Sequence, residues 1–266
     1  MIDHPKYNRL VSYLKDLGNV AIAFSGGVDS TFLLAVAAEA LNDNVIALTV
    51  KAPYIAEWEI VEAVELCRAL KIRHQIVETD IPDNIRKNPP DRCYLCKREI
   101  FSTLLDIARS SGIGNVLDGT NMDDPSDHRP GIKALKELGI KSPLQETGIN
   151  KAEVRRFSEM LGLPTWDKPS YACLLTRLPH GVEIEPGELK RIELAEKFLM
   201  DLGYKAVRVR SHGTIARIEA DPDILPELSG KNRAGMVVKK FRDLGFTFVT
   251  LDLEGYRTGS FNTFKS

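Results

Sequence analysis

Apolar and polar positions follow two different periods along the first part of the chain. Short apolar runs predict buried strands, and apolar residues that recur every three or four positions predict helices. The predicted strands cover residues 20–24, 45–50, 74–78 and 115–118. The predicted helices cover residues 1–17, a segment after Ser30, residues 55–70 and residues 97–110. Strands that alternate with helices favour a parallel sheet with helices on both faces, an α/β fold.

A further helix is predicted after Asn150. Asn150 can act as its N-cap, and Glu153 stands three residues later, as in a capping box. The helix ends near Gly162, because Pro164 blocks its continuation. Residues 164–186 then read as a loop that contains four prolines and one cysteine.

The pattern restarts after this loop. Helices are predicted at 188–202 and 231–244, and strands at 206–210, 214–220 and 246–253. We therefore expect two domains, a larger one over residues 1–182 and a smaller α/β domain over residues 183–266.

Composition narrows the class of protein. The chain of 266 residues is 43% hydrophobic and 27% charged, as in ordinary soluble proteins. No apolar run approaches the roughly 18 residues of a membrane span, and the charged N-terminal segment does not resemble a signal peptide. We expect a cytoplasmic protein. A formal net charge of −1 argues against binding along a nucleic-acid backbone.

The string SGGVDS, residues 25–30, lies between the first predicted strand and a helix. Gly26 and Gly27 allow backbone N–H groups to converge, and the helix N-terminus adds partial positive charge. Ser25 and Ser30 can donate hydroxyl hydrogen bonds to the same phosphate oxygens. The spacing fits neither the Walker loop nor the dinucleotide fingerprint.

SGGVDS resembles the PP-loop of the ATP pyrophosphatases, which cleave ATP between its α and β phosphates. The resemblance implies an ATP site that releases pyrophosphate and links AMP to a substrate. Asp29 would repel a bare phosphate, so we expect it to help hold Mg²⁺, which prefers carboxylate and phosphate oxygens.

Four cysteines stand at positions 67, 93, 96 and 173. Cys93 and Cys96 form a CxxC just before a predicted helix, a spacing that serves zinc, iron–sulfur clusters or redox exchange. A second pair of zinc ligands is missing from the sequence. Cys173 lies in the proline-rich loop, and three thiolates suit a 4Fe-4S cluster with one iron open to a sulfide. Cys67 lies on an apolar helix face and is expected to be a buried small hydrophobe.

The chain resembles the LarE family, ATP-dependent sulfur transferases of nickel-pincer-nucleotide biosynthesis. The resemblance rests on pieces spread over nearly the whole chain: SGGVDS (25–30), DRCYLCKREIF (91–101), LDGTNMDD (117–124), RPG (129–131), SPLQETGINKAEVR (142–155), LPTWDKPSYACLLTR (163–177), VRVR (207–210), ARIE (216–219) and GYRTGS (255–260). One departure is local: Leu175-Thr176-Arg177 stands where the family pattern has Ala-Ser-Arg.

The resemblance implies a substrate, a pyridinium mononucleotide with two carboxylates. ATP adenylates a carboxylate, sulfur replaces AMP, and repetition on the second carboxylate gives the dithio product. In one version of the family, the cysteine at the position of Cys173 gives up its own sulfur and becomes dehydroalanine. In the other, a CxxC joins it to hold a 4Fe-4S cluster fed by a sulfide source. Cys93 and Cys96 match the second version. The family also implies a homo-oligomer.

The remaining candidate residues follow from charge and position. Arginine can bind both oxygens of a phosphate or carboxylate. Arg208 and Arg210 alternate on a strand and share one face, so they are candidates for the substrate phosphate, with solvated strand charges as the alternative. Arg177 is a further candidate for catalysis. Gly119 and Thr120, at the end of the fourth strand, are expected beside the adenylate.

Two acidic residues follow in the same matched segment, LDGTNMDD. Asp123 and Asp124 either orient the adenylate or form a solvated turn.

Three rival functions are open to a chain with these motifs. A tRNA-thiolating PP-loop enzyme would add RNA-binding modules and a basic surface, which the sequence does not show. An amide-forming synthetase would need free ammonia, because the chain has no room for a glutaminase domain. A nucleotide-binding regulatory protein with a zinc-stabilised loop is the third rival.

Overall fold

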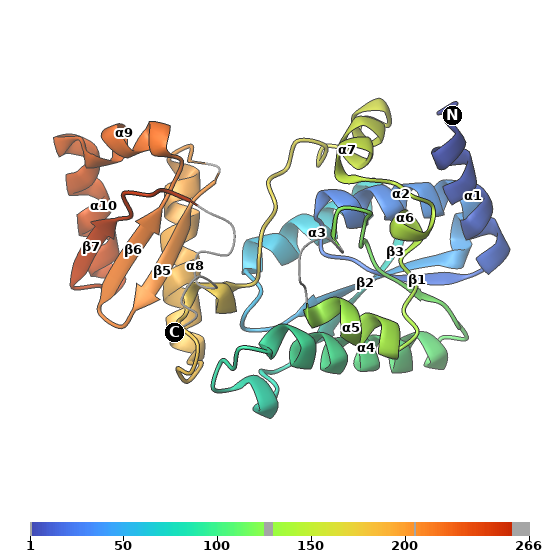
Figure 1. Cartoon of the computed structure of the whole chain (residues 1–266), viewed down its shortest axis with the longest axis horizontal. Coiled ribbons are helices and arrows are strands. Elements are labelled where there is room, and N and C mark those ends of the chain that lie inside the picture. The colour runs from blue at the N-terminus through green and yellow to red at the C-terminus, as the bar shows by residue number, and fades with distance from the viewer. Residues whose placement is uncertain (1, 125–129, 205, 257–266) are drawn as a thin grey trace. The chain divides into compact units, whose positions relative to one another are not determined.

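The computed structural model describes residues 2–124, 130–204 and 206–256, and its contacts divide the chain into two compact units (Figure 1). The first unit comprises the residues up to Ile85 together with Asp91–Tyr171, and the second comprises Arg86–Pro90 and the residues from Ala172 onward. The predicted domain boundary, by comparison, stands between residues 182 and 183. Within the described residues, no helix is long and apolar enough to cross a membrane.

The first unit contains a parallel sheet of the four predicted strands, in the order β3-β2-β1-β4. Their bounds are β1 Val20–Ala23, β2 Val45–Lys51, β3 Arg73–Glu78 and β4 Val116–Leu117. In the register, Ile22 of the central strand stands opposite Ala47 on one side and Leu117 on the other. The sheet confirms the predicted α/β class.

Helices cover both faces of this sheet, as expected (Figure 1). One face packs against α1 Pro5–Leu17, α2 Val28–Leu41, α3 Glu57–Ala69 and α7 Lys151–Met160. The other packs against α4 Arg92–Ser110 and α5 Pro130–Glu137. A hydrophobic core lies on each face of the sheet, and successive residues of a strand point to opposite faces. Ile22 accordingly belongs to the core beneath α1, α2, α3 and α7, and Ala21 belongs to the core beneath α4 and α5.

Local signals account for some helix ends and not for others. The capping box of α7 is present: the Glu153 N–H donates to Asn150 Oδ1 at 2.9 Å, and the Asn150 N–H donates to Glu153 Oε2 at 3.0 Å. Helix α4 begins at Arg92, so the CxxC lies inside its first turns and not before the helix as predicted. Helices α5 and α6 Pro143–Glu146 were not predicted. Each begins at a proline, which suits a first helical position.

The second unit has a three-stranded sheet in the order β5-β6-β7, and β5 is antiparallel to β6 while β6 is parallel to β7. Its elements are α8 Pro186–Asp201, β5 Arg208–His212, β6 Ile215–Glu219, α9 Leu225–Ser229, α10 Lys231–Asp243 and β7 Phe248–Leu251. Short 3₁₀ turns of this unit are η4 Leu174–Arg177 and η5 Pro222–Ile224, and those of the first unit are η1 Asn42–Asn44 and η2 Asp83–Ile85. The predicted helices and strands of this region are confirmed, and the short α9 was missed.

Candidate functional site

The PP-loop connects β1 to α2, as the sequence predicted. Gly26 has φ 66°, in the left-handed region that glycine adopts without strain, and Gly27 is the N-cap of α2. Ser30 Oγ donates to the Gly27 carbonyl at 3.2 Å and lies 3.2 Å from Ser25 Oγ. The hydroxyls therefore brace the loop, and the first N–H groups of α2, which have no partner within a helix, are available to an anion.

Gly119 lies against the start of α2. A Cβ at this position would meet the Ser30 nitrogen at 3.0 Å and Asp29 Cβ at 3.3 Å, so a larger residue would require the start of α2 to shift by a few tenths of an ångström. The neighbouring Thr120 is buried, and its hydroxyl bonds to Asp118. The structure thus brings the end of β4 to the PP-loop, where the sequence placed Gly119 and Thr120.

Asp29 has two partners from other segments. Asn121 Nδ2 donates to its Oδ1 at 3.0 Å, and Lys151 Nζ forms an ion pair with its Oδ2. Lys151 is the first residue of α7, and its N–H donates to Asp123 Oδ2 at 2.9 Å. Asp124 Oδ2 in turn accepts from the Asn121 N–H at 2.9 Å. The acidic pair therefore organises the turn that carries Asn121.

Two lysines beside the PP-loop were not singled out by the sequence. One is Lys151, and the other is Lys168, whose Nζ donates to the Gly26 carbonyl at 2.9 Å and pairs with Glu62 at 2.6 Å. Both lie in segments that match the family, INKAEVR and TWDKPSY, which was the available signal. They place two ammonium groups beside a string that contains no basic residue, and each ammonium is paired with a carboxylate.

The cysteines differ in their surroundings. Cys93 is exposed and Cys96 half-buried, and their spacing of three residues places both on one side of the first turns of α4. Cys96 Sγ donates to the Tyr54 hydroxyl at 3.5 Å. Cys67 is buried in the core, and burial raises the pKa of its thiol to about 12. Its predicted role as a small hydrophobe is confirmed.

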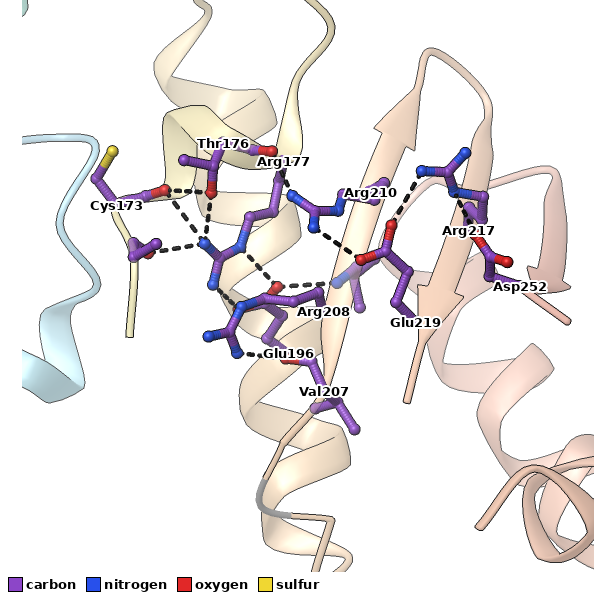
Figure 2. Close-up of polar contacts among 12 residues, drawn as sticks. Cys173, Thr176, Arg177, Glu196, Val207, Arg208, Arg210, Arg217, Glu219 and Asp252 are labelled. Carbon is purple, nitrogen blue, oxygen red and sulfur yellow. Dashed lines mark hydrogen bonds and ion pairs between the residues drawn. The ribbon is translucent and has the colours of Figure 1, made fainter. Parts of the chain in front are cut away.

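Cys173 belongs to the second unit and is the N-cap of η4 (Figure 2). Arg177 is 2% exposed and pairs with both carboxylate oxygens of Glu196 at 2.9 Å. Its NH1 also donates to the Ala172 carbonyl at 2.7 Å and the Cys173 carbonyl at 3.2 Å. Thr176 Oγ1 donates to the same Cys173 carbonyl at 2.9 Å. The departure at Thr176 thus keeps a hydroxyl that holds the cysteine backbone.

Arg208 and Arg210 are both buried, so the alternative of solvated strand charges is wrong. Arg210 pairs with Glu219 at 2.7 Å and donates to the Thr176 carbonyl at 2.5 Å (Figure 2). Arg208 lies over the Tyr256 ring, 5.0 Å from its centroid. Burial first, and then the nearby Arg177 guanidinium, lowers the pKa of Arg208 from its ordinary value. Arg177 and Arg210 are each paired with a buried glutamate, and the three guanidinium groups together outnumber these two carboxylates by one.

The predicted cluster ligands come from both compact units. Across residues 2–124, 130–204 and 206–256, no group of three or more His, Cys, Asp or Glu side chains that could hold a metal ion is present. Of the predicted cluster ligands, Cys93 and Cys96 belong to the first unit and Cys173 to the second. Arg129 of RPG and residues 257–260 of GYRTGS lie outside the described residues.

Comparisons with known proteins show which family the chain resembles. Residues 19–89 match the family model "Queuosine biosynthesis protein QueC", which covers β1, the PP-loop and β3. The chain is 43% identical to an uncharacterized protein of Synechocystis, over 97% of both chains. It is 34% identical to an uncharacterized protein of Methanocaldococcus jannaschii, over 90% of this chain and 91% of the relative.

A third relative has an assigned activity. The pyridinium-3,5-bisthiocarboxylic acid mononucleotide synthase of Lactiplantibacillus plantarum is 39% identical to the chain, over 95% of this chain and 92% of the synthase. This similarity covers nearly the full length of both chains. The chain belongs to the LarE family of PP-loop enzymes and is an ATP-dependent sulfurtransferase.

Proposed function

We propose that this enzyme uses ATP to adenylate a carboxylate of pyridinium-3,5-biscarboxylic acid mononucleotide and then replaces AMP with sulfur. The observation that carries the proposal is the PP-loop, braced by Ser25 and Ser30, in a chain related over almost its full length to a synthase of the bisthiocarboxylic acid mononucleotide. The rival functions, tRNA thiolation among them, have no comparable support.

The proposed reaction has two stages. A substrate carboxylate oxygen attacks the α-phosphorus of ATP, which forms an acyl adenylate and releases pyrophosphate. Hydrosulfide or its equivalent then attacks the acyl carbon, the bond to the AMP oxygen breaks, and a thiocarboxylate and AMP leave. The same two stages on the second carboxylate complete the dithio product.

The PP-loop residues have distinct proposed roles in the first stage. The N–H groups at the start of α2, with Ser25, Gly26, Gly27 and Ser30, hold the pyrophosphate portion of ATP. Asp29 exchanges its ion pair with Lys151 for Mg²⁺, which leaves the Lys151 ammonium free to contact a phosphate. Gly119 and Thr120 line the adenylate, since Gly119 already lies against Ser30.

Arg208 and Arg210 are the proposed ligands of the substrate phosphate. Burial, and after it the like charge of Arg177, lowers the pKa of Arg208, and a bound phosphate would offset the cost of keeping it charged. Arg210 and Arg177, which also hold the backbone of η4, tie that phosphate site to Cys173. Loss of the Arg208 contact should weaken substrate binding by roughly 1.5–3 kcal/mol.

Cys93, Cys96 and Cys173 are the proposed ligands of a 4Fe-4S cluster. The donor set fits: soft thiolates are the ligands that iron–sulfur clusters take, and two of them lie in the first turns of α4, where the helix dipole favours thiolate. When bound, the cluster would supply an exchangeable sulfide through an iron without a protein ligand. We also propose, from the resemblance alone, that the enzyme assembles as a homo-oligomer.

Incubation of the purified enzyme with ATP, Mg²⁺, sulfide and the biscarboxylic acid mononucleotide tests the function. We expect release of AMP and pyrophosphate together with mass-spectrometric detection of the mono- and then the dithiocarboxylate. Arg208→Ala should raise the KM for the mononucleotide and leave the KM for ATP unchanged. An absence of thiocarboxylate, with cluster and ATP both present, would show that the substrate is a different one.

A further inference from the structure

Lys168 contacts the first glycine of the PP-loop from a distant part of the chain. Its Nζ donates to the Gly26 carbonyl at 2.9 Å and to Glu62 of α3 at 2.6 Å, and its side chain is only 14% exposed. A lysine on the surface gains little from such contacts, but one that is largely shielded from water gives up hydration and depends on them. The hydrogen bond from Lys168 to the Gly26 carbonyl therefore contributes to the conformation of the PP-loop.

The Gly26 carbonyl and the Gly27 N–H belong to one planar trans peptide, so they point in opposite directions. The Gly27 N–H donates to Ser25 Oγ at 3.4 Å, and Ser25 is itself a proposed ligand of pyrophosphate. A partner that fixes the Gly26 carbonyl therefore also fixes an N–H that faces the proposed anion site. A peptide between two glycines rotates easily, because neither residue carries a Cβ. A rotated peptide would present its carbonyl oxygen to the phosphate and repel it.

The surrounding fold holds Lys168 in place. Arg155 of α7 donates to the Trp166 carbonyl at 2.7 Å and to the Lys168 carbonyl at 2.8 Å. The Lys168 ammonium lies 5.7 Å from the centroid of the Tyr171 ring. That ring packs edge-on against Trp58 of α3, with centroids 4.8 Å apart. The position of the ammonium group is thus set by two helices and by an aromatic pair.

We propose that Lys168 is a positioning residue that locks the Gly26–Gly27 peptide with the Gly27 N–H facing pyrophosphate. Lys168 acts through the peptide, and Glu62 serves to hold its ammonium group. The inference rests on the proposed function only where that function places pyrophosphate at the PP-loop. It is independent of the sulfur donor and of the cluster.

Two measurements test the proposal on the full chain. The first is calorimetric titration with magnesium pyrophosphate and, separately, with AMP. The second is the amide resonance of Gly27 in ¹⁵N-glycine-labelled protein without ligand. The variants are Lys168→Met, which keeps an apolar stem against Tyr171, and Glu62→Gln, which keeps an acceptor for the lysine. Lys6→Met serves as a matched control, because it removes a 2.8 Å lysine–glutamate pair elsewhere in the same unit.

We expect Lys168→Met to weaken pyrophosphate binding about tenfold or more, to leave AMP binding unchanged, and to shift the Gly27 amide resonance before any ligand is added. Glu62→Gln and Lys6→Met should bind pyrophosphate nearly as the unsubstituted enzyme does. An unshifted Gly27 resonance in Lys168→Met would overturn the proposal, and so would an equal loss of affinity in Glu62→Gln. Failure of the unsubstituted enzyme to bind pyrophosphate would instead overturn the nucleotide assignment of the loop, and this proposal with it.

Discussion

At the scale of single residues, Asp29 stands at the centre of the proposed nucleotide chemistry. Its carboxylate is bound by Asn121 and Lys151, so it neutralises a lysine that faces the same loop. Without ATP, the ammonium group of Lys151 balances the negative charge of Asp29. With ATP, Mg²⁺ would take the place of that ammonium group, so the carboxylate would not repel the phosphates. The role follows from which partners the fold brings to this side chain.

The first prediction concerns Asp29→Asn. The amide keeps the size of the side chain and can still accept from Asn121, but it cannot replace a carboxylate as a ligand of Mg²⁺. We expect substrate-dependent pyrophosphate release to be abolished while the thermal unfolding midpoint stays close to that of the unsubstituted enzyme. Asp16→Asn, on an exposed position of α1, is the matched control. Normal pyrophosphate release by Asp29→Asn would remove this residue from the mechanism.

The second prediction concerns His74 of β3, whose ring centroid lies 6.3 Å from that of Phe24, the residue just before the PP-loop. Thr49 Oγ1 donates to the Phe24 carbonyl at 2.8 Å, so it accepts from His74 Nε2, also at 2.8 Å. Burial lowers the pKa of His74 below its ordinary value of 6.5. The unfolded chain therefore binds a proton more readily than the folded protein does, and stability falls as the pH drops below about 6.5.

Urea unfolding at pH 7 and pH 5 measures this effect. We expect His74→Gln, which keeps a donor for Thr49 and cannot be protonated, to lose less stability between the two pH values than the unsubstituted enzyme loses. Other groups also titrate in this range, so the contribution of His74 is the difference between the two proteins in the stability lost from pH 7 to pH 5. An identical pH dependence in both would show that His74 contributes nothing to it.

At the scale of elements, the end of β4 and the start of α2 form one steric unit. A Cβ on Gly119 would lie 3.0 Å from the Ser30 nitrogen, a contact that the start of α2 could accept only by shifting. The contact links the segment just after β4 to the PP-loop, two segments far apart in the sequence. It gives a steric reason for a glycine two residues after the end of β4.

The third prediction follows from this contact. Gly119→Ala should push the start of α2 away, destabilise the protein by about 1–3 kcal/mol and raise the KM for ATP. Gly114→Ala is the control, because a Cβ there meets nothing within 4 Å. Urea midpoints and pyrophosphate-release kinetics measure the two effects. Equal urea midpoints and equal KM values for ATP in the two variants would mean that the start of α2 shifts to accept the Cβ at no cost.

Elements were predictable from the sequence where one segment carries its own signal. The strands and the main helices follow from apolar periodicity, and the start of α7 follows from Asn150 and Glu153. The beginning of α4 was placed too late, because the charged residues around the CxxC mask its helical period. Lys151 and Lys168 could not be assigned, since their partners Asp29 and Gly26 are brought to them only by the tertiary fold.

At the scale of the whole molecule, the proposed chemistry draws on both compact units. The nucleotide loop, Cys93 and Cys96 belong to the first unit, whereas Cys173 and the buried arginines belong to the second. The chain passes between the units just before Cys93 and again just before Cys173. The proposed ligands of the cluster are thus divided between the two units in the sequence, and substitution of the cysteines tests the proposal.

The fourth prediction separates delivery through a cluster from sacrifice of Cys173. If three thiolates hold one cluster, replacing Cys93, Cys96 or Cys173 by alanine should abolish both bound iron and sulfur transfer. Cys67→Ser removes a buried thiol with a raised pKa, so it should cost some stability and leave the iron content unchanged. Iron and acid-labile sulfide analysis of protein reconstituted without oxygen measures the first effect.

Turnover supplies the second measurement, on the same reconstituted enzyme. Delivery through a cluster leaves the polypeptide intact, so added sulfide should support many turnovers with no change in protein mass. Sacrificial transfer would instead stop after one sulfur per chain and remove the elements of H₂S from Cys173, because the thiolate sulfur is then the atom that enters the product. Dehydroalanine at position 173 after turnover, or full activity of Cys93→Ala, would establish sacrificial transfer, since neither is compatible with a cluster that needs all three thiolates.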